Sequence, residues 1–209
     1  MEREALEGAL LERIPEEQAR RLMEAKVGVA GLGGLGSHIA VMLARCFVGR
    51  LVLADFDRVE LTNLNRQAYG LSHLGKKKTE AIREILAQIN PCIQVETFDL
   101  RVTEKNAAEL FSGCAVVCEA FDRPGEKAML VNALLAGCPE TMVVAASGMA
   151  GWESTNLMRV ERPMRRLYVA GDGKADVEQG TALMAPRVMA CAGIQANMAI
   201  RLLLGEAEP

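Results

Sequence analysis

The chain has 209 residues, of which 50% are hydrophobic, and a formal net charge of −3 from 24 basic and 27 acidic side chains. A chain of this size can bury one substantial core, so we expect residues 1–209 to form a single domain. The charge balance and the 4% aromatic content argue against a nucleic-acid partner, which needs a basic surface and stacking platforms. No apolar run approaches the roughly 18 residues of a membrane-spanning helix, so no membrane partner is expected.

The first 25 residues are expected to form an N-terminal helical arm. Residues 2–24 show one or two short amphipathic patterns, and Pro15 stands where a helix would begin, ahead of Glu16 and Glu17. Residues 1–4 lack the basic start and apolar core of a signal peptide, which predicts a cytoplasmic location.

A predicted strand at 27–31 leads into a glycine-rich turn, and a helical pattern follows at about 34–47. This order is typical of a nucleotide-binding βαβ unit. Backbone N–H groups at a helix N-terminus attract anions, so the turn is expected to bind phosphate. The nucleotide-binding residues predicted in this turn are Gly31, Gly33, Gly34, Leu35 and Gly36.

A second predicted strand, 50–54, ends in Asp55, whose carboxylate can accept hydrogen bonds from both ribose hydroxyls. Asn63, Arg66 and a lysine run that ends in Lys78 follow closely. Arg66 can grip a phosphate through two parallel N–H bonds, whereas Lys78 supplies a movable point charge near the β and γ phosphates. A nicotinamide-dependent enzyme would not need these cations, so the pattern favours a nucleoside triphosphate.

Helical patterns recur near 75–89, 103–112, 125–137 and 185–204, and predicted strands at 93–98, 115–119 and 142–147 alternate with them. This alternation indicates an α/β fold with a Rossmann-like, doubly wound and mostly parallel sheet. Residues 153–160 alternate polar and apolar, which predicts an antiparallel edge strand. Residues 161–180 are expected to form a long loop.

The six cysteines form no C-x-x-C pair, so no structural zinc site is expected. They fall on apolar patterns and are interpreted as small buried hydrophobes. Residues 160–183 contain no cysteine, which argues against a covalent thiol intermediate. The cysteines are Cys46, Cys92, Cys114, Cys118, Cys138 and Cys191.

Three motifs together resemble the ThiF/MoeB/E1 superfamily: the turn at 31–37, the run from Asp55 to Gln67, and residues 75–78. The Asn-Leu-Asn-Arg-Gln sequence within the second motif is the most specific. The similarity continues through 116–122 and 145–160 into the last predicted helix, so it covers essentially the whole chain. The length and local variants look most like the short ThiF proteins of thiamine biosynthesis.

The resemblance implies an E1/ThiF-type fold and an ATP-dependent adenylyltransferase. Its substrate would be the C-terminal glycine of a ubiquitin-like sulfur carrier that ends in Gly-Gly and is similar to ThiS. The products would be an acyl-adenylate and pyrophosphate, and sulfur transfer would follow. The 161–180 segment would be a crossover loop that covers the carrier's tail.

The resemblance also implies roles for single residues. Asp57, Asn63 and Gln67 would contribute to nucleotide binding, and the catalytic residues would be Arg66, Lys78 and Asp122. Asp122 follows a predicted strand at the carboxyl edge of the sheet, where it would bind Mg²⁺ beside the ATP phosphates. A helix N-cap ahead of Pro124 is the alternative role of Asp122. Related enzymes form homodimers, and Arg13 is the candidate for an arginine that reaches the neighbour's triphosphate.

Two other classes of function stay open at this point. An NAD-dependent oxidoreductase would share the glycine turn and Asp55 but would leave Arg66 and Lys78 without a role. A non-catalytic module could retain the fold and bind a carrier without turnover. A tRNA-modifying branch of the superfamily is disfavoured because the chain lacks a basic surface for phosphates.

Overall fold

The structure, a computed structural model that describes residues 3–174 and 182–209, is built on a seven-stranded sheet of order β3-β2-β1-β4-β5-β7-β6. Neighbouring strands are parallel except for the antiparallel pair β6 and β7 at one edge. The predicted doubly wound, mostly parallel sheet with an antiparallel edge is therefore confirmed. The strands are β1 (Lys26–Ala30), β2 (Arg50–Ala54), β3 (Gln94–Phe98), β4 (Val116–Glu119), β5 (Met142–Ala146), β6 (Arg159–Met164) and β7 (Leu167–Gly171).

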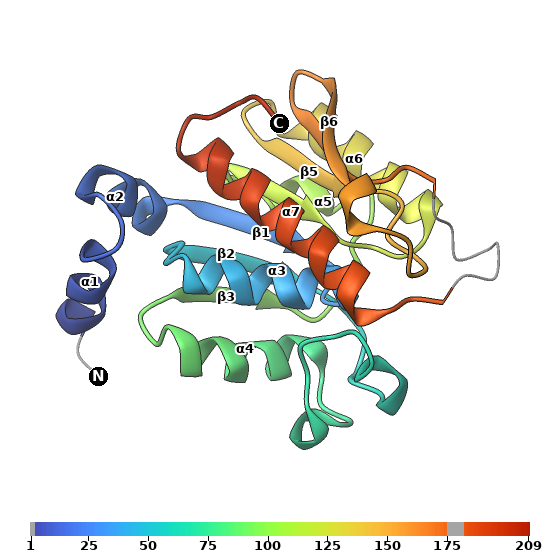
Figure 1. Cartoon of the computed structure of the whole chain (residues 1–209), viewed down its shortest axis with the longest axis horizontal. Helices are drawn as coiled ribbons and strands as arrows, with labels where there is room; N and C mark the ends of the chain where they lie inside the picture. Colours follow the sequence, from blue (N-terminus) through green and yellow to red (C-terminus); the bar gives the residue numbers. More distant parts are fainter. Residues whose placement is uncertain (1–2, 175–181) are drawn as a thin grey trace.

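Helices cover both faces of this sheet. Figure 1 shows α3 (Gly34–Arg45) and α7 (Ala185–Leu203) in front of the strands, with α4 (Lys78–Ile89) below them and α5 (Ala107–Leu110) and α6 (Pro124–Gly137) behind. Alternate residues of a strand point to opposite faces. Leu51 and Leu53 of β2 accordingly pack in the core under α3, α4 and α7, whereas Val52 and Ala54 pack in a second core under α5 and α6.

The central strands are apolar along nearly their whole length because both faces are covered. In β1, β2 and β5, every residue after the first is buried. Such strands leave polar groups only at their ends, so the functional side chains gather where the strands stop.

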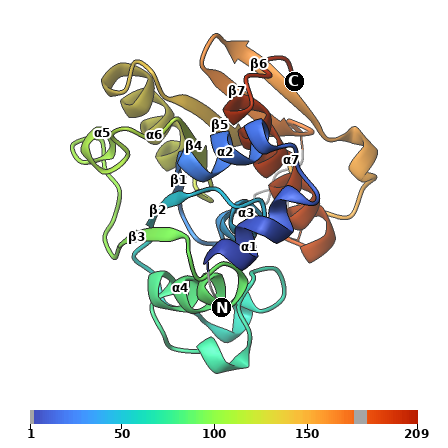
Figure 2. The same ribbon diagram turned by 90° about the vertical axis from the view of Figure 1, so that its left-hand side faces the viewer.

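Two helices, α1 (Arg3–Leu11) and α2 (Glu16–Glu24), occupy the predicted N-terminal arm, and Pro15 immediately precedes α2 as predicted. Figures 1 and 2 show both helices at the end of the sheet where β1 begins. No helix in the described ranges is long and apolar enough to span a membrane.

The prediction of a long loop over 161–180 is wrong for most of its described part. Residues 161–164 belong to β6, and residues 167–171 form β7, which pairs in parallel with β5. The apolar run at 167–170 fills a place in the sheet, although the neighbouring arginines and Pro163 suggested a loop. Pro163 is tolerated because β6 is an edge strand. Residues 175–180 of the predicted loop lie outside the described residues.

The predicted edge strand at 153–160 is also displaced. A short 3-10 turn, η3 (Thr155–Leu157), occupies the middle of that segment, and strand structure begins only at Arg159. The Ser154 hydroxyl accepts a hydrogen bond from the Asn156 N–H, and this local bond favours a turn over an extended chain. The antiparallel edge itself is confirmed, with Val160 opposite Ala170.

Candidate functional site

A cavity of about 640 Å³ opens beyond the carboxyl ends of the central strands. It lies where β1 and β4 are neighbours and their connections run to opposite sides, the usual ligand site of open α/β sheets. Every predicted site residue except Gly36 and Arg13 lines it. Those that it brings together are Gly31, Gly33, Gly34, Leu35, Asp55, Asp57, Asn63, Arg66, Gln67, Lys78 and Asp122.

The glycine turn is built by close backbone contact. A Cβ atom at Gly36 would lie 1.8 Å from the Gly31 carbonyl oxygen, so only glycine permits α3 to start this close to the turn. Gly31 has a φ of 91°, and its N–H donates to Ala54 O at 2.8 Å. Gly36 is thus a packing residue rather than a lining one. Gly33 caps α3 without a side chain, which leaves the first N–H groups of the helix to an anionic ligand.

Asp55 is held against the turn at the end of β2. Its Oδ2 accepts a hydrogen bond from the Leu32 N–H at 2.6 Å, and its Oδ1 accepts one from the Asp57 N–H at 2.8 Å. Burial raises the pKa of the Asp55 carboxyl above its usual value, while Lys78 and the two N–H donors oppose that shift. The carboxylate is therefore fixed in orientation at the position predicted for ribose recognition.

Lys78, the first residue of α4, is buried beside two carboxylates. Its Nζ lies 2.8 Å from Asp57 Oδ2 and 3.9 Å from Asp55 Oδ2. The Lys78 N–H also donates to Asp57 O at 2.9 Å, which ties the start of α4 to the loop after β2. The structure thus brings a cation from α4 to the wall that carries the glycine turn.

Arg66 and Gln67 approach the turn from the segment after the 3-10 turn η1 (Leu61–Asn63). Arg66 Nη1 donates to Thr62 O at 3.2 Å, and a Cβ atom at Gly34 would lie 3.5 Å from Arg66 Cγ. The Gln67 side chain is buried in the cavity wall, and its Oε1 has no hydrogen-bond partner among the described residues. A buried amide oxygen without a partner fits a site that a polar ligand completes.

Asn63 holds this segment in shape rather than pointing freely into the cavity. Its Oδ1 accepts a hydrogen bond from the Glu60 N–H at 3.1 Å, and its backbone oxygen accepts one from the Gln67 N–H at 2.9 Å. These bonds fix the path of the chain between Glu60 and Gln67, and they therefore fix the backbone position from which the Arg66 side chain extends.

Asp122 is exposed on the loop after β4 and lines the cavity. A buried ion pair that the sequence did not reveal supports this loop. Lys127 Nζ lies 2.8 Å from Glu119 Oε2 and donates to Phe121 O at 3.0 Å, while Glu119 Oε1 accepts the Phe121 N–H at 2.7 Å. Burial raises the pKa of Glu119, and Lys127 opposes this. The sequence offered one sign of this pair: Glu119 is an acidic residue at the end of an otherwise apolar strand, where a buried charge needs a partner.

The remaining wall follows β5 and β7, and it was not predicted. Ser147, Gly148 and Met149 line it together with Gly173 and Lys174. A Cβ atom at Gly148 would lie 2.1 Å from Asp172 Oδ1, so the two loops are in tight contact.

Arg187 of α7 is only 2% exposed and stabilises this wall through hydrogen bonds to the segments on both of its sides. Its Nη2 donates to Asp172 Oδ2 at 2.5 Å, and its Nη1 donates to Glu153 O at 2.7 Å. The sequence could have indicated this role, because Arg187 lies within an apolar helical pattern and a buried charge needs partners.

Arg13 and the cysteines lie elsewhere. Arg13 is exposed in the turn between α1 and α2, outside the cavity wall. Its role across a dimer interface stays a prediction. Burial is confirmed for four of the cysteines and wrong for Cys46 and Cys92, which are half-buried. Burial raises the pKa of Cys114, Cys118 and Cys191 to about 12.

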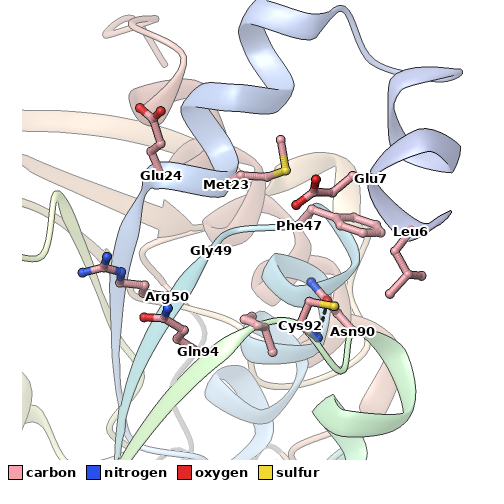
Figure 3. A pocket seen from close by; sticks show the side chains of 11 residues that line it. Leu6, Glu7, Met23, Glu24, Phe47, Gly49, Arg50, Asn90, Cys92 and Gln94 are labelled. Atoms are coloured by element: carbon pink, nitrogen blue, oxygen red, sulfur yellow. Dashed lines mark hydrogen bonds between the residues drawn. The ribbon is translucent and has the colours of Figure 1, made fainter. Parts of the chain in front are cut away.

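Cys92 lines a separate pocket of about 360 Å³ between the arm and the starts of β2 and β3. In Figure 3, Leu6 and Glu7 of α1 face Phe47 and Cys92 across this space. None of the predicted site residues lines it. It lies at the amino end of the strands, whereas the cavity described above lies at their carboxyl end.

Known proteins resemble this chain in sequence and in fold. The molybdopterin-synthase adenylyltransferase of Salmonella typhimurium is 33% identical over 201 residues, which cover 92% of this chain and 78% of that protein. A segment of 91 residues is 41% identical to ubiquitin-like modifier-activating enzyme 5 of Caenorhabditis elegans, covering 44% of this chain and 22% of that enzyme. The chain thus spans only about a fifth of the length of the latter relative.

Among solved structures, the tRNA N6-threonylcarbamoyladenosine dehydratase of Escherichia coli in complex with AMP superimposes with a TM-score of 0.85. It is 25% identical, and the match covers 96% of this chain and 94% of that one. The ThiF family model matches residues 7–209, a range that includes the glycine turn, the Asp55–Lys78 wall and the Asp122 loop. With its sequence, fold and cavity in agreement, the chain belongs to the ThiF family.

Proposed function

We propose that this protein uses ATP to adenylate the C-terminal carboxylate of a ubiquitin-like carrier protein. The observation that supports this most is the charge arrangement of the cavity. Arg66 and Lys78 line the cavity together with the glycine turn, and Asp122 lines it from the loop after β4. The two cations and the free N–H groups at the start of α3 would together offset the charge of three phosphates. This arrangement suits a triphosphate better than a nicotinamide dinucleotide.

The chemistry requires positioning rather than a protein nucleophile. A carboxylate of the carrier is ionised at neutral pH, and its oxygen forms a bond to the α-phosphorus while the bond to the bridging oxygen breaks and pyrophosphate leaves. Arg66 and Lys78 would offset the negative charge that develops, and the turn would orient the phosphates. The acyl-adenylate is the product.

Asp122 would bind the Mg²⁺ that accompanies ATP. Magnesium commonly takes one or two carboxylates and completes its shell with phosphate oxygens and water. A single exposed carboxylate at the cavity edge fits that donor set. The described residues contain no cluster of three or more metal-binding side chains. The expected absence of zinc stays a prediction.

The acyl-adenylate is proposed to pass to another protein without a thioester to this one. Residues 160–183 contain no cysteine, and burial raises the pKa of Cys191, the cysteine of α7, to about 12. A thiol in that state is a poor nucleophile because the reactive form is the thiolate.

For the carrier we propose a ThiS-like sulfur carrier with a Gly-Gly end, which would place the protein in thiamine biosynthesis. This rests on the chain length and on two local sequences, Asn-Arg-Gln-Ala-Tyr at 65–69 and Ala-Ser-Gly-Met-Ala-Gly at 146–151, which resemble the short ThiF proteins. The Salmonella relative is named for molybdopterin synthase, so a carrier of that type is the direct competitor. We further propose that the protein acts as a homodimer.

ATP–pyrophosphate exchange tests this function. Purified protein is mixed with ATP, Mg²⁺, labelled pyrophosphate and one of several carriers, each with and without its last glycine. We expect exchange only with intact carriers. Lys78→Ala should lower the rate roughly 10²-fold, as for other lost charge-stabilising donors. Lys76→Ala is the matched control, because Lys76 pairs with Glu84 on the surface, outside the cavity.

Three outcomes would contradict the proposal in different ways. ATP binding without exchange for any carrier would indicate a non-catalytic module. Tighter binding of NAD than of ATP in calorimetry would indicate an oxidoreductase. Equal losses in Lys78→Ala and Lys76→Ala would remove Lys78 from the mechanism.

A further inference from the structure

One corner of the cavity contains an arginine that the proposed mechanism does not use. Arg101 follows β3, and the carbon of its guanidinium lies 5.4 Å from the centroid of the Phe56 ring. It also forms an ion pair with Glu126 in the first turn of α6. All three residues line the cavity, and Phe56 is 51% exposed. Three separate segments therefore meet at this planar cation.

The backbone that carries Arg101 is fixed. Asn106 Nδ2 donates to Arg101 O at 3.1 Å, and Asn106 Oδ1 accepts the Thr103 N–H at 2.7 Å. With Glu126 and Phe56 engaging its end, Arg101 is held at both ends of the side chain. A freely solvated surface arginine would have neither constraint.

The position of Arg101 in the sheet separates it from the phosphate wall. Strand order runs β1, β2, β3, so the segment after β3 lies beyond Asp55 as seen from the glycine turn. Besides Glu126, the lining residues nearest to Arg101 along the chain are the apolar Leu100 and Val102, and the ring of Phe56 lies under its guanidinium. This corner thus offers a planar cation and apolar surface, whereas the other end offers N–H groups and phosphate-binding cations.

We propose that Arg101 is a specificity-determining residue that binds the purine ring of ATP. The inference rests on the proposed binding of ATP in this cavity. A guanidinium is flat and always charged, so it stacks on an electron-rich ring while Glu126 keeps it in plane and Phe56 supports it. Lysine carries the same charge but cannot stack in this way.

Binding calorimetry without any carrier tests this, and it requires no turnover. The probes are ATP and inorganic tripolyphosphate, which has the phosphates but no base. We expect Arg101→Ala to weaken ATP binding roughly tenfold and to leave tripolyphosphate binding unchanged. Arg101→Lys should not restore ATP affinity, and Phe56→Leu should cause a smaller loss. Arg20→Ala is the control, because Arg20 pairs with Glu16 on the exposed side of α2.

Tripolyphosphate binding also reports whether each variant is folded. If Arg101→Ala weakens both probes equally and Arg101→Lys restores both, Arg101 acts only as a charge near the phosphates, and the inference is wrong. It is equally wrong if Arg101→Ala binds ATP like the wild type while pyrophosphate exchange proceeds. If wild type binds ATP through Arg101 but never exchanges pyrophosphate, adenylyl transfer is refuted and the role of Arg101 is supported.

Discussion

The two sides of the cavity are constructed differently. The side proposed to bind phosphate, here called the phosphate side, comprises the glycine turn and Asp55 and is held by backbone contacts: Gly36 lies against the Gly31 carbonyl, and Asp55 accepts the Leu32 N–H. The side after β5 and β7 is held by side-chain charges, with Arg187 buried between Asp172 and the Glu153 carbonyl. Both sides contain a glycine without room for a Cβ atom, Gly36 on one and Gly148 on the other, but the second side depends in addition on a buried arginine and its distant partners. The comparison teaches that backbone packing alone does not hold every part of one cavity.

The largest effect is expected from breaking the buried charge pair. Arg187→Met keeps much of the side-chain volume but removes the guanidinium from Asp172, so the free energy of unfolding should fall by about 3–5 kcal/mol. Urea denaturation at pH 7 measures this. Arg159→Met is the matched control, because the Arg159–Glu161 pair is exposed on β6 and should contribute less than about 1 kcal/mol. Equal losses in the two variants would show that Arg187 does not hold the wall.

A glycine comparison tests how tightly the same wall is packed. Gly148 and Gly113 both have positive φ, 78° and 72°, but a Cβ atom would have open space at Gly113 and would contact Asp172 at Gly148. Gly113→Ala should lower the unfolding free energy by about 1–2 kcal/mol through backbone strain alone. Gly148→Ala should cost about 1–3 kcal/mol more, because it also overpacks the contact. Similar midpoints in thermal denaturation for both variants would contradict this packing.

The smallest effect concerns pH and the phosphate side. His38 Nε2 lies 3.1 Å from the Arg66 carbonyl, and burial lowers the pKa of His38 below its usual 6.5 despite that bond. The unfolded chain therefore binds the proton more readily than the folded one. Stability from a neutral His38 is present above pH 6.5 and is lost as the pH falls below it.

Thermal denaturation between pH 5 and 8 measures this dependence. His38→Gln should flatten the acid side of the profile relative to wild type. A wild-type slope retained in His38→Gln would assign the acid sensitivity to other groups.

The phosphate side could be predicted well from the sequence and the other side only poorly, for a physical reason. Glycine spacing and a carboxylate after a strand are local signals, so the amino-acid pattern alone was enough to place residues 31–36 and Asp55. The partners of Arg187 lie 15 and 34 residues away along the chain. Nothing in the local pattern around Arg187 or Glu119 indicates which distant group compensates its charge.

The same limit explains the error over 161–180. Charged residues and a proline dominate that stretch. Its apolar run at 167–170 has only four residues, so the composition of the whole stretch indicated a loop rather than a strand. Pairing of β7 with β5 is a long-range contact that overrides the local composition. By contrast, the main helices and the central parallel strands carry enough periodicity to be predicted, with boundaries that differ by only a few residues.

The contact between Gly36 and the Gly31 carbonyl also restricts how such a protein can change over generations. Any side chain larger than hydrogen at position 36 must displace the carbonyl of Gly31, and the Gly31 N–H is itself bonded to Ala54 at the end of β2. In the wall after β5 and β7, Gly148 is restricted in the same way by Asp172, and the Arg187–Asp172 pair could change only if both partners changed together. If the turn binds phosphate as proposed, a lineage built on this fold therefore inherits that part of the site as a unit.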